Sequence, residues 1–277
     1  MTTVASTPDK RARFDAAPFL RPIAHRGLHS RAAGRIENSA AAFRAAIEGG
    51  YGIECDLQAA KDGVAMVFHD EHLERLMAAR GRVSARSAAE LTRLDYRRRP
   101  WVGRRGGAPD GGGGPRGMLT LSACLQLIAG RVPVLAEIKR NRSPPPAGFL
   151  EGIAAAAAGY AGPLALMSFD RELLGSLGRL APSLPRGWTV GRHQLAARWW
   201  AVAGAPGKDR AVARLLATAP KGMAFLAVDV AIVRAARAYL EAERLALPLF
   251  TWTVRTQRDR RAAARWADAP IFEGYVP

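Results

Sequence analysis

The sequence predicts an α/β protein folded as a closed (β/α)8 TIM barrel. Short apolar runs alternate with helix-like segments, and about eight of these runs have the length of a strand. Such alternation is typical of a parallel sheet covered by helices, and 277 residues are enough for one complete barrel. We therefore predict a single barrel domain over residues 1–277, with an N-terminal extension at 1–20 and a small insertion at 71–117 after the third strand.

The expected elements follow from apolar periodicity and from glycine and proline positions. Asn38 is expected to cap a first helix that ends near Glu48. Residues 103–117 hold eight glycines and two prolines, so we expect a surface loop there. Strands are expected at 23–24, 51–57, 64–68, 132–138, 164–168, 188–190, 224–228 and 249–254. Further helices are expected at 87–94, 121–129, 147–159, 171–180, 195–203, 211–217, 231–243 and 257–267.

The composition excludes several other classes of protein. Hydrophobic residues make up 49% and charged residues 23%, which excludes a disordered or fibrous chain. Cys55 and Cys124 are the two cysteines, so a disulfide framework is excluded and both are expected to pack as small apolar groups. Neither a targeting segment nor an apolar run of membrane-spanning length is visible, and we expect a cytoplasmic protein.

The charge is strongly positive. Lys and Arg total 41 against 24 Asp and Glu, for a net charge of +17, and all but five of the positive residues are arginine. An arginine excess often reflects codon composition and is therefore weak support for a polyanionic partner. It does predict attraction to anionic substrates and lipid headgroups at low salt.

Polar side chains cluster where the predicted strands end. The set comprises His25 after the first strand, Glu54 and Asp56 on the second, His69 after the third, and Glu137 and Lys139 on the strand 132–138. In a TIM barrel the carboxyl ends of the strands open on one face, which is where active sites form. Taken singly, such residues are more often structural, and Glu37-Asn38 alone would be a helix cap. Their joint placement favours a functional site.

The spacing of the carboxylates predicts a metal site. Residues i and i+2 on a strand point to the same side, so Glu54 and Asp56 can face the barrel mouth while Cys55 faces the helices. With Glu137 they form an oxygen-only donor set, which suits Mg²⁺ or Ca²⁺. Two histidines beside such a cation suggest acid–base catalysis, and Arg26 and Lys139 supply positive charge for a phosphate. The set suits metal-assisted cleavage of a phosphodiester.

Several ordered motifs also resemble the N-terminal signature of the glycerophosphodiester phosphodiesterase family. They are His25-Arg26-Gly27, Glu37-Asn38-Ser39, Glu54-Cys55-Asp56, Lys61-Asp62-Gly63 and Phe68-His69-Asp70. Glu137-Ile138-Lys139 resembles the second metal-ligand segment of the family. Ser168-Phe169-Asp170 and Thr251-Trp252-Thr253 are similar to later strands of the family, so the resemblance spans about residues 22–255.

The resemblance implies a TIM barrel that hydrolyses glycerophosphodiesters to glycerol 3-phosphate and an alcohol. Carried over by position, it implies metal ligands at Glu54, Asp56 and Glu137, an acid–base pair at His25 and His69, and phosphate or glycerol contacts at Arg26, Glu37 and Lys139. The cofactor would be a divalent cation, Mg²⁺ or Ca²⁺. Whether water or the glycerol 2-hydroxyl attacks stays open.

The chain departs from the family pattern near its C-terminus. Arg255 stands where an asparagine often follows Trp-Thr-Val, and Glu273-Gly274 replaces a frequent Thr-Asp. Both departures concern the shape of the substrate site more than the metal ligands, and Arg255 could add a contact to a phosphate or headgroup.

Two alternative functions stay open at this point. The positive charge could dock the barrel on anionic membranes, where it would act on lysophospholipids as a lysophospholipase D-like enzyme. A non-enzymatic, basic nucleic-acid-binding barrel is the second alternative. Aromatic residues are only 7% of the chain and are not interleaved with the arginines, so we expect a small-molecule substrate and no specific nucleic acid.

Overall fold

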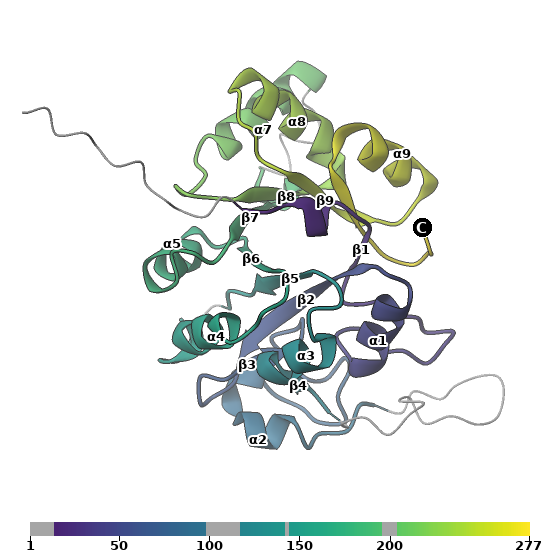
Figure 1. Ribbon diagram of the computed structural model, residues 1–277, viewed down its shortest axis with the longest axis vertical. Helices are drawn as coiled ribbons and strands as arrows, with labels where there is room; N and C mark the ends of the chain where they lie inside the picture. Colours follow the sequence, from purple (N-terminus) through teal and green to yellow (C-terminus); the bar gives the residue numbers. More distant parts are fainter. Residues whose placement is uncertain (1–13, 98–116, 142–143, 196–203) are drawn as a thin grey trace, which may run out of the picture.

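The computed structural model describes residues 14–97, 117–141, 144–195 and 204–277. Within these ranges, eight parallel strands form a closed ring with helices around its outside (Figure 1). The order around the ring is β1 (Ile23–Ala24), β10 (Ala269–Phe272), β9 (Leu249–Val254), β8 (Phe225–Asp229), β7 (Arg186–Val190), β6 (Leu164–Ser168), β5 (Val134–Ile138) and β2 (Gly52–Ala59). Strand β1 pairs with both β10 and β2, which closes the ring and confirms the predicted TIM barrel.

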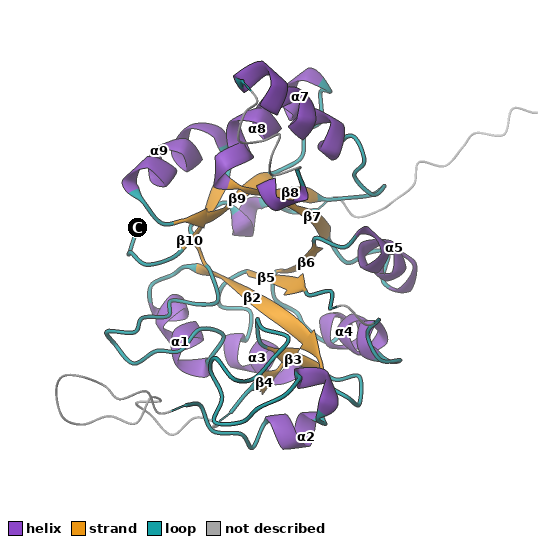
Figure 2. Cartoon of the chain, turned by 180° about the vertical axis from the view of Figure 1, so that it is seen from behind, coloured by secondary structure: helices purple, strands orange, loops and turns teal. Residues whose placement is uncertain are grey.

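Helices connect the parallel strands and cover the outer face of the barrel (Figure 2). They are α1 (Ala40–Glu48), α3 (Leu121–Ile128), α4 (Phe149–Ala158), α5 (Arg171–Leu180), α7 (Ala205–Leu216), α8 (Val233–Ala242) and α9 (Gln257–Trp266). Short 3₁₀ helices lie at η1 (Ala17–Phe19), η2 (Val83–Ala85), η3 (Arg192–Gln194) and η4 (Val230–Ile232). No helix in the described part of the chain combines the length and the apolar composition that crossing a bilayer requires.

The strand expected at 64–68 is present as β3 (Ala65–Val67), but it is not part of the ring. It pairs antiparallel with β2, and β4 (Leu119–Thr120) pairs antiparallel with β3. The five residues between β2 and β3 are too few for a parallel crossover, which needs about a dozen or more. The eighth strand of the ring is instead β10, which the apolar pattern did not reveal.

Helix boundaries agree with the expected ones to within a few residues, with two differences of substance. Ser39, not Asn38, caps α1, and its side chain accepts a hydrogen bond from the Ala42 N–H. Helix α7 begins at Ala205, six residues before the expected start, with a proline in its first turn. The helix expected at 195–203 lies, apart from its first residue, outside the described residues, as does almost all of the loop expected at 103–117.

The insertion that follows β3 packs around a small core of its own. Its described part contains η2 and α2 (Ala88–Leu91), which begins with a capping box formed by Ser87 and Glu90. The buried side chains of this core are Ala60, Met66, Phe68, Leu73, Met77, Val83, Ala88, Leu91 and Met118. The described part of the insertion therefore forms a module beside the barrel, and His69 lies at its junction with β3.

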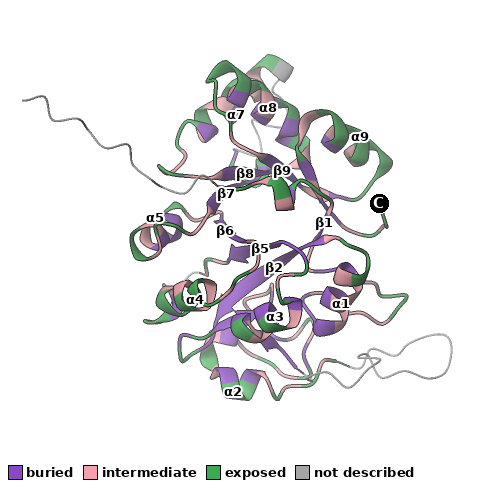
Figure 3. Ribbon diagram, viewed as in Figure 1, coloured by how far each residue is buried: buried purple, intermediate pink, exposed green. Residues whose placement is uncertain are grey.

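The barrel and its helices are held together by two separate layers of apolar side chains. Figure 3 shows the strands buried and the outward faces of the helices exposed. One layer lies inside the ring and includes Phe225 and Phe250, whose ring centroids are 5.2 Å apart. The other lies between strands and helices and includes Cys55 and Cys124, both buried and free, as expected.

The interior packing predicts a strong effect of one added methyl group. Gly187 on β7 lies opposite Phe225 on β8, and a Cβ on Gly187 would overlap the Phe225 ring. We expect Gly187→Ala to lower the free energy of unfolding by about 1–3 kcal/mol through overpacking, measured by denaturant titration. Combined with Phe225→Leu the two losses should be less than additive, and simple additivity would contradict the predicted overlap.

Candidate active site

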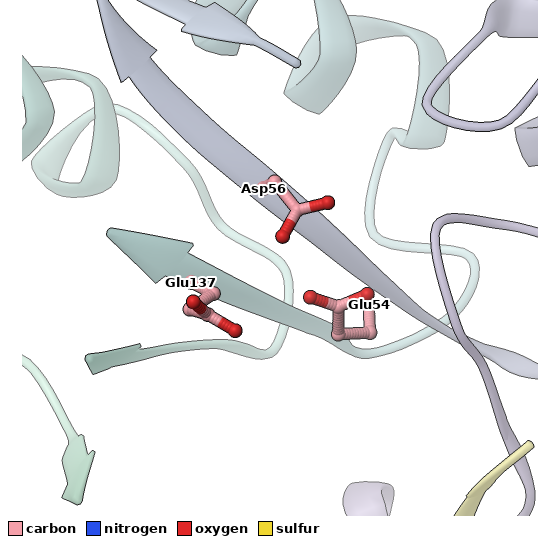
Figure 4. Close-up of side chains that lie close together, drawn as sticks. All are labelled: Glu54, Asp56 and Glu137. Carbon is pink, nitrogen blue, oxygen red and sulfur yellow. The ribbon is translucent and has the colours of Figure 1, made fainter. Parts of the chain in front are cut away.

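Three acidic side chains meet at the carboxyl ends of two neighbouring barrel strands. Glu54 and Asp56 project from β2, and Glu137 projects from β5 (Figure 4). Asp56 and Glu137 are partners in the parallel register of the two strands, so the pairing itself brings them side by side. All three are buried, and one carboxylate oxygen from each lies within 4.8 Å of the others. The sequence-predicted carboxylate cluster is therefore present.

The donor set of this cluster fits a hard divalent cation. Each carboxylate offers an oxygen, which is the ligand type that Mg²⁺ and Ca²⁺ prefer. The buried Oε1 atom of Glu54 finds no hydrogen-bond partner among the described residues. A buried, unpartnered carboxylate oxygen is costly unless a cation or another donor meets it. These three residues could accordingly hold the ion.

The carboxylates do not share the same electrostatic environment. Burial raises the pKa of Glu54 well above its ordinary value, and the charges of Asp56 and Glu137 raise it further. Burial likewise raises the pKa of Glu137, against the opposing charge of Lys139. Burial also works against the charged form of Asp56, but Lys139 and Arg26 outweigh it and lower the Asp56 pKa. Asp56 is therefore the most firmly ionised of the three.

Lys139 and Arg26 supply the positive charge that faces the cluster. The Lys139 Nζ atom lies 2.8 Å from Asp56 Oδ1 and 2.6 Å from Glu137 Oε1. Arg26 Nε lies 3.1 Å from Asp56 Oδ2, and the backbone N–H of Arg26 donates to Glu54 Oε2 at 2.9 Å. Both side chains therefore place positive charge directly against the carboxylate cluster.

Two residues next to the cluster adopt left-handed backbone conformations. Arg26 has a φ of 57° and Asn38 a φ of 56°, in a region that is uncommon for residues other than glycine. The conformation of Asn38 places its side-chain Nδ2 2.8 Å from Asp56 Oδ2, to which it donates. Asn38 thus supports a carboxylate of the cluster, and Ser39 takes the capping role instead.

His25 lies beside the cluster at the end of β1. Its Nδ1 atom is 2.7 Å from Glu273 Oε2, and its Nε2 atom is 3.9 Å from Glu54 Oε2. The side chain is 11% exposed, and burial lowers the His25 pKa although the hydrogen bond to Glu273 opposes this shift. The ring therefore stays neutral more readily than a free imidazole and turns Nε2 toward the carboxylates.

His69 reaches the same mouth from the insertion module. Its Nδ1 atom is 2.7 Å from Asp70 Oδ1, and its backbone carbonyl accepts from Gln58 Nε2 at 2.9 Å. We expected His69 here because it follows a predicted strand of the barrel. That reason was wrong, because β3 pairs antiparallel with β2 and lies outside the ring. A cavity of about 510 Å³ opens at this side of the site, and its lining includes His69, Arg75 and Lys139.

Glu37 lies between two arginines. It accepts from Arg26 Nη1 at 2.7 Å and from both terminal nitrogens of Arg75 at 2.7 and 2.8 Å. Burial opposes its charged form, but the Arg75 hydrogen bonds and the Arg26 charge outweigh burial and lower the Glu37 pKa. Arg75 also donates to Asp70 Oδ1 at 3.0 Å, and Asp70 Oδ1 contacts His69 Nδ1. Glu37 is therefore linked to His69 through Arg75 and Asp70.

The structure thus brings all eight sequence-predicted site residues to one face, and it adds three that sequence reasoning did not assign to the site. Asn38, Arg75 and Glu273 each contact a predicted site residue directly. Glu273 directly follows β10. Had that strand been recognised in the sequence, Glu273 would have been expected at the barrel mouth with the other residues that follow strands. Arg75 lies in the insertion, where no pattern distinguishes it from the other arginines.

The fold and the site together define a TIM-barrel protein with an acidic, imidazole-flanked site at its mouth. Comparison with known proteins narrows this class further. The profile of the glycerophosphoryl diester phosphodiesterase family matches residues 25–273, and the chain belongs to this family.

Individual relatives agree with the family. A Mycobacterium tuberculosis protein named probable glycerophosphodiester phosphodiesterase 1 is 32% identical over 182 residues, which is 61% of this chain and 62% of that protein's length. A Silicibacter pomeroyi crystal structure, described as a candidate glycerophosphoryl diester phosphodiesterase, is 25% identical with a TM-score of 0.66, covering 91% of this chain and 89% of that one. An Oleispira antarctica phosphodiesterase, solved with its product sn-glycerol-3-phosphate, shares the fold at 22% identity and a TM-score of 0.66, covering 94% and 96%.

The charge repulsion in the cluster makes a prediction about stability. Glu54→Gln keeps the shape and the acceptor for the Arg26 N–H while removing one of three buried like charges. We expect the metal-free variant to gain roughly 1 kcal/mol, or about 2–4 °C in Tm, measured by differential scanning fluorimetry. Added Mg²⁺ or Ca²⁺ should raise the Tm of the wild type and much less that of the variant.

The stability that Glu54→Gln gains over the wild type should also depend on pH. The folded state holds the Glu54 proton more tightly than the unfolded state, because the folded pKa is raised. The wild type therefore loses stability, relative to Glu54→Gln, as pH rises above the ordinary glutamate pKa. Glu241→Gln, on the exposed face of α8, is the matched control and should show neither effect. A Glu54→Gln variant less stable than the wild type without metal would contradict the repulsion.

Proposed function

We propose that this protein is a metal-dependent phosphodiesterase that hydrolyses glycerophosphodiesters to glycerol 3-phosphate and an alcohol. The observation that carries the proposal is the meeting of a buried carboxylate cluster with two imidazoles at one barrel mouth. Membership of the family supports this substrate class, as does the Oleispira antarctica neighbour with its sn-glycerol-3-phosphate.

Substrate binding follows from the charges on the face. Arg26 and Lys139 present guanidinium and ammonium groups to the phosphate oxygens, and Glu37 holds Arg26 in place. Glu54, Asp56 and Glu137 would hold a divalent cation, Mg²⁺ or Ca²⁺. When bound, that cation would offset the three carboxylates, polarise the phosphoryl group and stabilise the charge that develops as the bond breaks.

The two histidines divide the proton transfers between them. Both imidazoles engage a carboxylate through Nδ1, at Glu273 for His25 and at Asp70 for His69, which leaves both Nε2 atoms for the reaction. One ring accepts a proton from the attacking hydroxyl, and the other donates a proton to the leaving alcohol. Attack by water would give glycerol 3-phosphate directly. Attack by the glycerol 2-hydroxyl would release the alcohol and leave a cyclic glycerol phosphate, which water would then open with the two imidazoles in exchanged roles.

This scheme predicts that either histidine is needed for turnover. His25→Ala and His69→Ala should each lower kcat by about 10²–10⁴-fold with a smaller change in KM, because a proton transfer is lost and binding is not. The assay measures glycerol 3-phosphate released from glycerophosphocholine. A chelator should abolish activity, and Mg²⁺ or Ca²⁺ should restore it. Full metal-dependent turnover by His25→Ala or Glu54→Ala would refute the assignment.

One observation favours a lysophospholipid as an additional substrate. Phe169 follows β6 and Trp252 lies on β9, and their rings meet edge to face at 5.4 Å. Both aromatic residues are only partly buried, so their rings could contact an acyl chain beside the phosphate site.

The lysophospholipid alternative is tested by comparing two substrates. If it holds, lysophosphatidylcholine in anionic vesicles should be turned over faster than soluble glycerophosphocholine, and Trp252→Ala should reduce only the vesicle reaction by about 10-fold, as expected for the loss of a buried aromatic contact. Equal or better activity on the soluble diester, unaffected by anionic lipid, would reject it.

A further inference from the structure

A chain of three side chains runs away from the candidate metal site behind His25. Glu273 Oε2 lies 2.7 Å from His25 Nδ1, and the same oxygen lies 2.8 Å from Arg255 Nη2. His25, Glu273 and Arg255 directly follow β1, β10 and β9, in that order, and these three strands are neighbours in the ring. The two departures from the family pattern, Arg255 and Glu273, therefore contact each other, and one of them contacts a predicted catalytic group.

The arrangement behind His25 repeats the one behind His69. There, Asp70 engages the imidazole Nδ1 at 2.7 Å, and Arg75 donates to Asp70 at 3.0 Å. Both histidines are thus backed by a carboxylate, and each carboxylate is in turn held by an arginine. The two sets come from different segments of the chain, the ends of β1, β10 and β9 for His25 and the segment after β3 for His69. The shared order of imidazole, carboxylate and guanidinium indicates a shared role.

The chemistry of that role follows from the hydrogen bond. A carboxylate can only accept, so the His25 ring must carry its proton on Nδ1 to bond with Glu273. The neutral ring then has its lone pair on Nε2, the atom that lies 3.9 Å from Glu54 Oε2. Burial opposes the charged form of Glu273, but the His25 hydrogen bond and Arg255 outweigh it and lower its pKa to about 2. Glu273 is accordingly an ionised acceptor at neutral pH.

We propose that Glu273 is the positioning residue for His25, fixing its tautomer and ring orientation, and that Arg255 holds the Glu273 carboxylate in place. This assigns the Arg255 side chain to Glu273 and not to the substrate phosphate. The effect of Glu273 on turnover rests on the proposed function, whereas its effect on the His25 ring does not.

If the Arg255–Glu273 ion pair had only a structural role, removing it would have different effects from removing a residue that positions His25. The Glu273 side chain is 22% exposed and that of Arg255 is 53% exposed, so solvent screens the pair and its removal should change stability little. Orientation of a catalytic imidazole by a second carboxylate is instead felt in the chemical step. The two roles are therefore separable by comparing kcat with KM and with Tm.

The kinetic test uses four variants assayed on glycerophosphocholine. Glu273→Ala should lower kcat by about 10–100-fold with KM and Tm little changed. Glu273→Gln retains an acceptor oxygen and should recover part of the loss. Arg255→Met should lower kcat by less than Glu273→Ala, because the carboxylate stays in place. Arg258→Met, an exposed arginine on α9, is the matched control and should behave as wild type.

The orientation of His25 is tested without turnover, by nitrogen NMR of protein carrying ¹⁵N-labelled histidine. The chain has five histidines, and the His25 signals are assigned by their loss in His25→Ala. In the wild type, at a pH where the ring is neutral, His25 should be the Nδ1–H tautomer. In Glu273→Ala it should become a mixture with the Nε2–H form.

The two readouts separate failure of this inference from failure of the proposed function. If the diester is not a substrate, no variant turns over, and the tautomer still decides whether Glu273 positions His25. An unchanged tautomer in Glu273→Ala overturns the inference. A changed tautomer with unchanged kcat in an active enzyme overturns the role of Glu273 in catalysis.

Discussion

The concentration of buried negative charge on strands β2 and β5 is the constraint from which the rest of the site follows. Parallel pairing places Asp56 beside Glu137, and alternation along β2 adds Glu54 on the same side. Buried like charges are unfavourable unless positive groups and donors surround them. Lys139, Arg26 and Asn38 all contact these carboxylates, so the cluster dictates which side chains its neighbours must present.

The same constraint links the proposed binding of substrate to its proposed cleavage. On the proposed function, a cation or phosphate arriving at the mouth would meet groups that are already oriented by their contacts with the carboxylates, so little rearrangement would be required. The left-handed backbone of Arg26 fits this account, since it points the amide at Glu54 while the side chain reaches Asp56 and Glu37. Local backbone strain of this kind persists where surrounding contacts hold it. The site is thus preorganised by interactions that do not involve substrate.

Sequence reasoning reached the barrel and the eight site residues because both depend on local patterns. Glu54 and Asp56 needed only the two-residue period of a strand, the ends of the expected strands supplied most of the other positions, and the ordered motifs gave them expected roles. Sequence reasoning failed where the pairing of a strand depends on how the strand is connected to its neighbours along the chain. The hairpin between β2 and β3 turns back because its loop is short, and β10 is an apolar run of only four residues that contains a proline, too short to stand out. Glu273 was noticed only as a departure, since its contact with His25 exists only once the ring closes.

The antiparallel hairpin divides the two imidazoles between structural units of different kinds. His25 belongs to the closed ring, whereas His69 lies where β3 joins a module with its own apolar core. Local opening of that module would withdraw one imidazole while the ring and its carboxylates stay intact. A protein loosened only in this module would still fold as a barrel and keep its acidic cluster, yet it would lack one of the two imidazoles proposed to transfer protons.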